Sequence, residues 1–130
     1  MSLVWGAIYM KKPKKCYFKV PVVNAEYFVF VCIDTREGGL RRVKKYFKDT
    51  GEVWTPDIFE VRGKTFRNSA YNPLIWIDVN GKDFLSTVAH EACHAMIEIF
   101  NYIDQDITKA EEVFALNVGF IVKAVIHETK

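Results

Sequence analysis

The chain has 130 residues, of which half are apolar and 15% are aromatic. This composition excludes a disordered chain, and the length suits one domain, 1–130, with its own core. Three cysteines are too few and too irregularly spaced for a disulfide framework, so we expect a reduced, cytoplasmic protein. No apolar run is long enough to cross a membrane, and the first apolar residues precede the first charges, unlike a secretory signal.

The charged residues are unevenly distributed, although the formal net charge is only +2. Residues 1–70 carry 14 Lys/Arg against 7 Asp/Glu, whereas residues 71–130 carry 4 against 9. The basic clusters run from Lys11 to Lys15 (KKPKK) and from Arg41 to Lys45 (RRVKK). Such clusters occur on nucleic-acid surfaces, but a lysine-rich tail and the solvated face of a helix produce them more often. Nucleic acid is therefore a candidate partner only.

In chain order, the first predicted elements are two strands at 16–23 (CYFKVPVV) and 26–33 (EYFVFVCI), joined by a short turn. The segment 34–40 (DTREGGL) has the composition of a loop. Apolar residues then recur at helical spacing over 40–48, which predicts an amphipathic surface helix that ends at Gly51.

The middle of the chain has a mixed pattern. The segment 52–73 mixes turn signals with short apolar runs, and we expect weak strands and a long loop there. The apolar run PLIWIDV (73–79) predicts a strand. Asp83 is placed to cap a helix that continues to about Tyr102.

The last predicted helix covers about 109–128, with Thr108 as its cap. The order of elements is therefore strands, helix, strands and two helices. This order predicts an α+β fold in which a largely antiparallel sheet packs against two C-terminal helices.

The stretch STVAHEACHAMIE (86–98) places His90 and His94 four positions apart, with Glu91 next to the first. Residues four apart lie on one face of a helix, so both imidazoles can bind one tetrahedral Zn²⁺. Glu91 is rotated by about 100° and can reach a metal-bound water without binding the metal. The pattern predicts a hydrolytic zinc site with Glu91 as the catalytic base. The competing explanation is a helix that carries two surface histidines by chance.

A catalytic zinc site normally has three protein ligands and a water. Glu98 lies about 12 Å beyond His90 along the helix axis, so one straight helix cannot bring both to one ion. Glu112, near the start of the last helix, is the favoured third ligand. Ala115 and Gly119 follow on its face, and such small residues would let that helix approach another closely.

Two alternatives to Glu112 remain. Glu111 points about 100° away from it, and either carboxylate can instead be a helix-start residue favoured by the helix dipole. His127 is the only other histidine, but it lies about 22 Å from Glu112 along a continuous helix. Tyr71, Tyr102 and His127 are also possible donors to an oxyanion, although an ordinary surface or interfacial role is the simpler explanation for each.

With HEACH on one helix and EEVFA on the next, the sequence resembles gluzincin-type zinc metallopeptidases, whose elements are His-Glu-x-x-His and Glu-x-x-Ala. Residues 73–122 also resemble small zincin-like proteins encoded by phages and prophages. The resemblance implies that His90, His94 and Glu112 bind zinc and that Glu91 is the base. It also implies a minimal zincin-like core, with a strand edge beside the active-site helix for an extended substrate.

The sequence departs from this pattern at one point. Many gluzincins have an aspartate four residues after the third ligand, where this chain has Leu116 followed by Asn117. The residue that supports a ligating histidine in those proteins therefore has no counterpart at this position.

The sequence thus predicts a zinc-dependent metallopeptidase that hydrolyses a peptide bond in a peptide or protein substrate. A second hypothesis is a catalytically slack zinc-containing binding module whose basic N-terminal half docks nucleic acid or a protein partner. A third is a structural zinc that joins the two helices. Catalysis is favoured because a structural site has no need of Glu91 and normally closes its fourth coordination position.

Overall fold

A computed structural model of the chain describes residues 12–50, 61–68 and 72–130. Its elements, in chain order, are β1 (Cys16–Val22), β2 (Tyr27–Asp34), α2 (Arg36–Asp49), β3 (Gly63–Phe66), β4 (Leu74–Asp78), α3 (Phe84–Tyr102) and α4 (Glu111–Glu128). The predicted first, second and fourth strands and both C-terminal helices are confirmed, each within about two residues.

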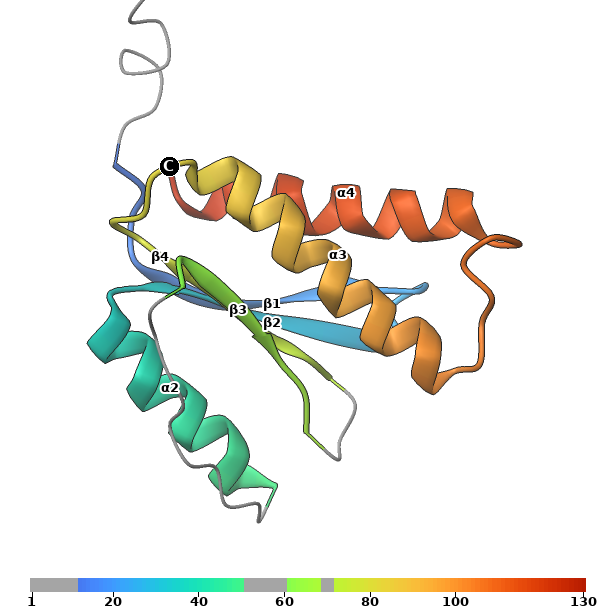
Figure 1. Cartoon of the computed structure of the whole chain (residues 1–130), viewed down its shortest axis with the longest axis horizontal. Coiled ribbons are helices and arrows are strands. Elements are labelled where there is room, and N and C mark those ends of the chain that lie inside the picture. The colour runs from blue at the N-terminus through green and yellow to red at the C-terminus, as the bar shows by residue number, and fades with distance from the viewer. Residues whose placement is uncertain (1–11, 51–60, 69–71) are drawn as a thin grey trace, which may run out of the picture.

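The four strands form one sheet in the order β1-β2-β4-β3 (Figure 1). The two outer pairs, β1 with β2 and β3 with β4, are antiparallel, whereas the central pair is parallel, with Val31 opposite Ile75. The prediction of an α+β fold with a mostly antiparallel sheet is therefore confirmed. All five residues of β4 are buried, because a central strand with a parallel neighbour is covered on both faces.

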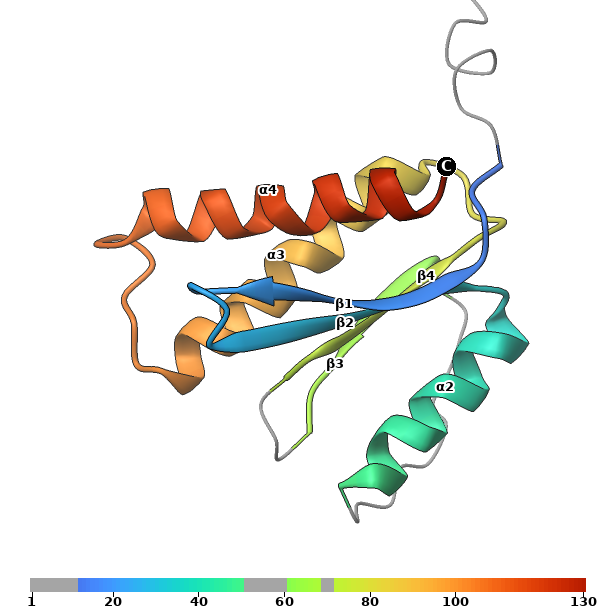
Figure 2. The same ribbon diagram turned by 180° about the vertical axis from the view of Figure 1, so that it is seen from behind.

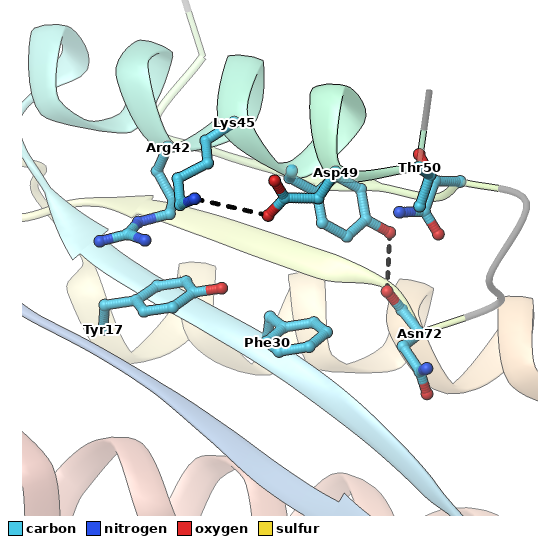
Figure 3. A pocket seen from close by; sticks show the side chains of 9 residues that line it. Tyr17, Phe30, Arg42, Lys45, Asp49, Thr50 and Asn72 are labelled. Atoms are coloured by element: carbon cyan, nitrogen blue, oxygen red, sulfur yellow. Dashed lines mark hydrogen bonds and ion pairs between the residues drawn. The ribbon is translucent and has the colours of Figure 1, made fainter. Parts of the chain in front are cut away.

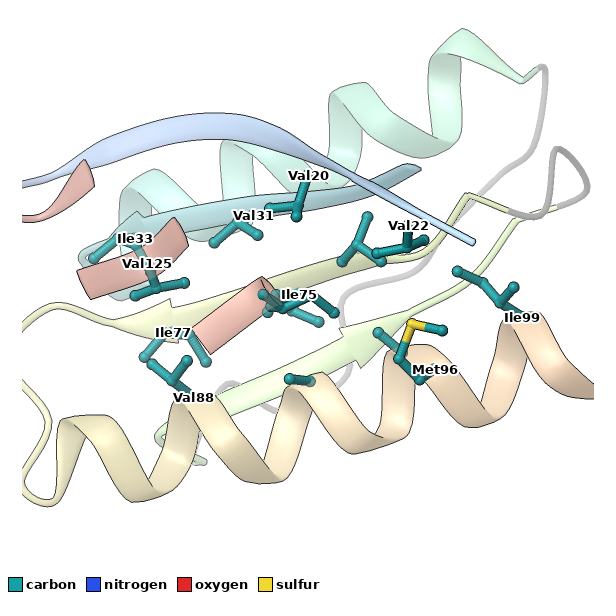
Figure 4. Close-up of a cluster of buried hydrophobic side chains, with 14 of the residues drawn as sticks. Val20, Val22, Val31, Ile33, Ile75, Ile77, Val88, Met96, Ile99 and Val125 are labelled. Carbon is teal, nitrogen blue, oxygen red and sulfur yellow. The ribbon is translucent and has the colours of Figure 1, made fainter. Parts of the chain in front are cut away.

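Helices cover both faces of the sheet. Helices α3 and α4 lie side by side on one face, and α2 lies on the other (Figures 1 and 2). The larger core lies under α3 and α4, and Figure 4 shows Val31, Ile75, Ile77 and Met96 among its side chains. The smaller core lies under α2 and consists of Cys32, Val43, Tyr46, Phe47, Phe66, Leu74 and Trp76. Strands β2 and β4 supply both cores because successive strand side chains point to opposite faces.

Helix α2 begins at Arg36, so the loop predicted at 34–40 is wrong. Thr35 caps the helix, since its side chain accepts a hydrogen bond of 3.1 Å from the Gly38 N–H. Each glycine disfavours a helix by about 1 kcal/mol relative to alanine. Here the cap and the tertiary packing outweigh that cost.

The packing that needs Gly39 is a close approach between α2 and strand β4. A Cβ atom at Gly39 would lie 2.3 Å from Nε1 of Trp76. A Cβ atom at Gly38 would likewise overlap the carboxylate of Asp34. Glycine therefore lets the first turn of α2 lie directly against the sheet.

Three further local predictions need correction. Strand β3 includes Gly63, although RGK (62–64) is one of the turn signals in the segment 52–73. Asp83 is the N-cap residue of α3 but makes no capping hydrogen bond; its carboxylate instead lies 3.2 Å from Arg62 Nη1. Thr108 does not cap α4, because it bonds to the Asp106 side chain and the helix begins after Ala110.

Parts of the predictions lie outside the described residues. These parts are Lys11, the helix end at Gly51 and the strand signals at 52–60. Within the three described ranges, no helix is long and apolar enough to span a membrane.

The turn between β1 and β2 has an uncommon backbone. Val23, Asn24 and Ala25 have φ angles of 52°, 56° and 64°, a left-handed conformation that costs L-residues other than glycine roughly 1–2 kcal/mol each. Asn117 of α4 supports this turn, since its Oδ1 accepts a hydrogen bond of 2.9 Å from the Val23 N–H. The last helix therefore holds the first hairpin in place.

Candidate active site

Helix α3 carries the His-Glu-x-x-His pattern and packs against β3 and β4 (Figure 1). Its apolar face, which includes Val88, Ala95 and Ile99, is buried against the sheet. His90 and His94 lie on the exposed part of the helix. The apolar pattern of the helix therefore fixes the direction in which the histidines point.

The two histidine side chains converge. Nε2 of His94 lies 3.1 Å from Nε2 of His90, and the rings meet edge to face. Two nitrogen ligands at about 2.0–2.1 Å from one zinc ion lie about 3.3 Å apart in a tetrahedral arrangement. The observed separation is that of a hydrogen bond between the two imidazoles, and it is also close to the spacing of two ligands of one ion. Both side chains are exposed, so water and further ligands can approach from solvent.

Glu91 points into the space between α3 and strand β3, and only 7% of its surface is exposed. Its Oε1 accepts a hydrogen bond of 2.7 Å from Thr65 Oγ1, which also lies 3.1 Å from the Glu91 carbonyl oxygen. The other carboxyl oxygen, Oε2, lies 3.9 Å from Nε2 of His90. One oxygen is thus held by the strand while the other faces the histidines.

A groove follows β3 on both sides of Glu91. One open cavity of about 390 Å³ is lined by Thr65, Glu91 and His94, among others. A second of about 420 Å³ is lined by His90 and Glu91. Gly63 lines both cavities, so together they form one groove between α3 and β3. In the sheet built by the described residues, β3 is an edge strand.

Glu112 does not lie with the histidine pair. Across 12–50, 61–68 and 72–130, no three His, Cys, Asp or Glu side chains are grouped so that they could hold a metal ion. The expectation that Ala115 and Gly119 pack closely against another helix is wrong. Ala115 is exposed, and a Cβ atom at Gly119 would meet nothing within 4 Å. Within the part of the chain that the structure describes, no helix packs against these small residues.

The position of α4 explains this difference. Helix α4 packs on β1 and α3, whereas α3 packs on β3 and β4. Since β1 and β3 are opposite edges of the sheet, α4 and the groove lie on opposite sides of α3. The buried side of α4 carries Asn117, Ile121 and Val125. Glu112 is about 140° around the helix from Asn117 and is exposed.

The neighbours of Glu112 have other environments. Glu111 is also exposed, and Leu116 is 57% exposed. Asn117 is 3% exposed, and besides its bond to Val23 its Nδ2 donates to the Val113 carbonyl at 2.7 Å. Asn117 therefore has a structural role and does not support a histidine.

The remaining candidates are dispersed. Glu98 lies one turn beyond His94 and forms an ion pair of 3.2 Å with Arg67. Tyr102 meets the Tyr27 ring edge to face at the end of α3. His127 lies 3.8 Å from the Glu128 carboxylate at the end of α4, with 78% of its side chain exposed. Tyr71 lies outside the described residues.

Thr65 is the site residue that the sequence analysis missed. It belongs to a four-residue strand whose first residues, Gly63 and Lys64, have the composition of a turn. Period-two alternation could have revealed it. Phe66 is buried in the core under α2, so its neighbour Thr65 must face α3.

Comparison with known proteins gives no match: no family model, no curated protein and no solved structure is significantly similar to the chain. Inferences about function therefore depend on the geometry of the described residues.

Proposed function

We propose that the chain is a zinc-dependent hydrolase of the metallopeptidase type, in which His90 and His94 bind Zn²⁺ and Glu91 is the general base. The observation that best supports this proposal is the 3.1 Å separation of the two Nε2 atoms beside a buried carboxyl. Two surface histidines present by chance would not require a glutamate between them to be held by a strand hydroxyl.

The side chains around Glu91 suit proton transfer. Zinc, when bound by histidines, lowers the pKa of a coordinated water to about 7. Thr65 holds Oε1 of Glu91, so Oε2, on the side of His90, is the oxygen that takes up a proton. The same oxygen can then donate this proton to a leaving amine nitrogen. The Thr65 hydrogen bond keeps the carboxyl in one orientation during both transfers.

The groove supports a peptide as the substrate. In the sheet that residues 12–50, 61–68 and 72–130 form, β3 is at the edge and runs beside Glu91. An extended peptide can pair with such an edge through main-chain hydrogen bonds, which bind many sequences without regard to their side chains. A peptide placed in this way would lie along β3 in the groove that His90, Glu91 and His94 line.

The histidine pair fits zinc, but two protein ligands are fewer than the three that catalytic zinc sites normally have. The predicted third ligand, Glu112, lies apart from the pair in this structure. Its role as a ligand stays a prediction that metal analysis must decide, together with the role of Glu111.

The first test is zinc content, measured by mass spectrometry on protein purified without added metal. We expect about one zinc per chain in the wild type and in Glu91→Gln, and loss of zinc in His94→Ala. Glu112→Ala and Glu111→Ala identify the third ligand, with Glu98→Ala as the matched control within the groove. Absence of metal from the wild type after titration with zinc would overturn the proposal.

The second test is hydrolysis of a peptide library. A general base contributes about 10²–10⁴-fold to a rate, so Glu91→Gln should lower cleavage by at least about 100-fold while keeping its zinc. Equal cleavage by the wild type and this variant would refute the assigned role of Glu91.

A structural zinc would behave differently. It would be needed for folding, and substitution of Glu91 would be harmless. The packing argues against this role, because α3 and α4 are already joined by apolar contacts such as the edge-to-face pair of Phe100 and Phe114. We therefore expect a chelator to abolish hydrolysis and to leave the far-UV circular dichroism spectrum unchanged.

A further inference from the structure

Aromatic side chains gather on the opposite side of the sheet, where α2 lies. Tyr17 of β1 and Phe30 of β2 project from this face, as Figure 3 shows. Their rings are parallel within 4°, with centroids 6.2 Å apart. Phe28 is two residues before Phe30 and projects from the same face of its strand. We call Tyr17, Phe28 and Phe30 the aromatic platform; Tyr17 is 40% exposed and the two phenylalanines are partly exposed.

Cations accompany each end of the aromatic platform. The guanidinium carbon of Arg42 lies 3.7 Å from the Tyr17 ring centroid, and Nζ of Lys19 lies 4.5 Å from that of Phe28. Lys45 lines a cavity beside Tyr17 and Phe30. Its ion-pair partner Asp49 is 3.6 Å away, and both side chains are 63% exposed. An exposed pair of this kind is weak. The helix that carries Arg42 and Lys45 has six Lys/Arg and two Asp/Glu.

A cavity of about 230 Å³ lies between this helix and the strands. Two hydrogen bonds hold Asn72 in its wall. The Tyr46 hydroxyl donates to the Asn72 carbonyl at 2.7 Å, which Figure 3 marks with a dashed line, and the Phe28 N–H donates to Asn72 Oδ1 at 3.0 Å. Pockets for whole small molecules usually measure about 300–1,000 Å³. The cavity therefore suits one planar ring of a longer molecule better than a complete ligand.

We propose that the aromatic platform binds single-stranded nucleic acid. Arg42 covers one face of Tyr17 and Lys19 covers one face of Phe28. These two cations would swing from the rings to phosphates as bases stack on Tyr17, Phe30 and Phe28, and Lys45 would contact a further phosphate. Aromatic rings beside a basic groove are the combination that binds single strands without strict sequence preference. A duplex keeps its bases stacked on one another and cannot use the rings. This surface is on the other face of the sheet from His90 and His94, so the inference is independent of the proposed hydrolase.

The test is fluorescence anisotropy with labelled 12-nucleotide oligo(dT) and oligo(U), and with a 12-base-pair duplex, using the full-length protein. We expect both single strands to bind more tightly than the duplex. If the single strand makes three phosphate contacts, raising the salt concentration from about 50 mM to 200 mM should weaken its binding about 20-fold.

Two pairs of variants separate stacking from charge. Tyr17→Leu should weaken single-strand binding about tenfold and leave the salt dependence unchanged. Tyr102→Leu, at an exposed tyrosine on α3, is its control and should have no effect. Arg42→Gln should weaken binding and reduce the salt slope by about 0.7. Lys123→Gln, an equal loss of charge on α4, should change neither.

Two results would overturn the proposal. One is no binding of any oligonucleotide at about 50 mM salt. The other is duplex binding as tight as single-strand binding with no effect of Tyr17→Leu, which would show a merely basic surface. Circular dichroism of each variant confirms that lost binding does not reflect lost folding.

Discussion

Thr65 on edge strand β3 and Glu91 on helix α3 are joined by a hydrogen bond of 2.7 Å between Thr65 Oγ1 and Glu91 Oε1. This bond connects the wall of the groove to the candidate base. It also satisfies a carboxyl oxygen that would otherwise be buried without a donor, which makes the bond important for stability as well as for the site.

Replacement of Thr65 by valine keeps the size of the side chain and removes the donor. Hydrogen bonds to charged groups contribute about 1.5–3 kcal/mol, so we expect the free energy of unfolding in urea to fall by about that amount. Thr65→Ser should retain most of the stability. The double variant Thr65→Val, Glu91→Leu should lose less than the sum of the single losses, because neither partner is then left alone. Strict additivity would show that the two side chains do not interact.

Gly39 and Gly119 provide a matched comparison, because both lie inside helices. Gly119→Ala should raise the free energy of unfolding by about 1 kcal/mol, since a Cβ atom there would meet none of the described residues within 4 Å. At Gly39 the same atom would lie 2.3 Å from Trp76 Nε1, and the overlap should destabilise the fold by about 1–3 kcal/mol. Chemical denaturation measures both. A gain in stability from Gly39→Ala would contradict the close packing of α2 on Trp76.

The thiol of Cys32 should be the least reactive of the three. Burial, and to a lesser extent the nearby Asp34 carboxylate, raises the pKa of Cys32 to about 12. Burial, and to a lesser extent the Glu128 carboxylate, also raises the pKa of Cys16. At pH 8 a disulfide reagent should therefore label Cys32 much more slowly than the exposed thiols of an unfolded chain. The slow phase should disappear in Cys32→Ala. Equal rates for all three thiols in the folded protein would show that Cys32 is accessible.

The same shift has a consequence for stability at high pH. The unfolded chain ionises this thiol near its ordinary value of 9.0, whereas the folded chain keeps it protonated to about 12. The unfolded state therefore binds fewer protons in this range, and the free energy of unfolding should fall as pH rises from about 9 to about 12. Cys32→Ala should show a smaller fall than the wild type over that range.

Asn117 should be needed for stability despite its distance from the groove. Asn117→Ala removes the acceptor of the partly buried Val23 N–H and should lower the free energy of unfolding by about 1–3 kcal/mol. Leu116→Ala, at a residue that is 57% exposed, is the matched control and should have little effect.

Ala25→Gly should stabilise the protein by about 1 kcal/mol, because glycine adopts the φ of 64° without strain.

Helix α3 and its histidine pair were predictable because both depend on local spacing. Residues four apart share a face in any helix, and the apolar positions decide which face is buried. The strands were predictable for a similar reason, since β2 and β4 are long apolar runs. The burial of Gly38 and Gly39 inside α2 could not be predicted, because it depends on Trp76 and Asp34, which belong to other elements.

The position of Glu112 was unpredictable for a related reason. Small residues at 115 and 119 permit close packing, but they do not determine which side of a helix packs. In α4 the side that packs against the protein carries Ile121 and Val125. The strand order of the sheet then places α4 away from the groove. Thr65 was missed because a strand of four residues offers too short a pattern to distinguish from a turn.

The bond between Val23 and Asn117 spans 94 positions, and this affects how the chain folds during synthesis. At about 5–20 residues per second, the ribosome delivers Asn117 roughly 5–20 s after Val23. An isolated two-stranded hairpin is at best marginally stable in water, and this one has three left-handed residues in its turn. The nascent hairpin therefore lacks the acceptor for its turn until the last helix has emerged. The first strands to be made are among the last to become stable, and the domain should fold as a unit once α4 has left the ribosome.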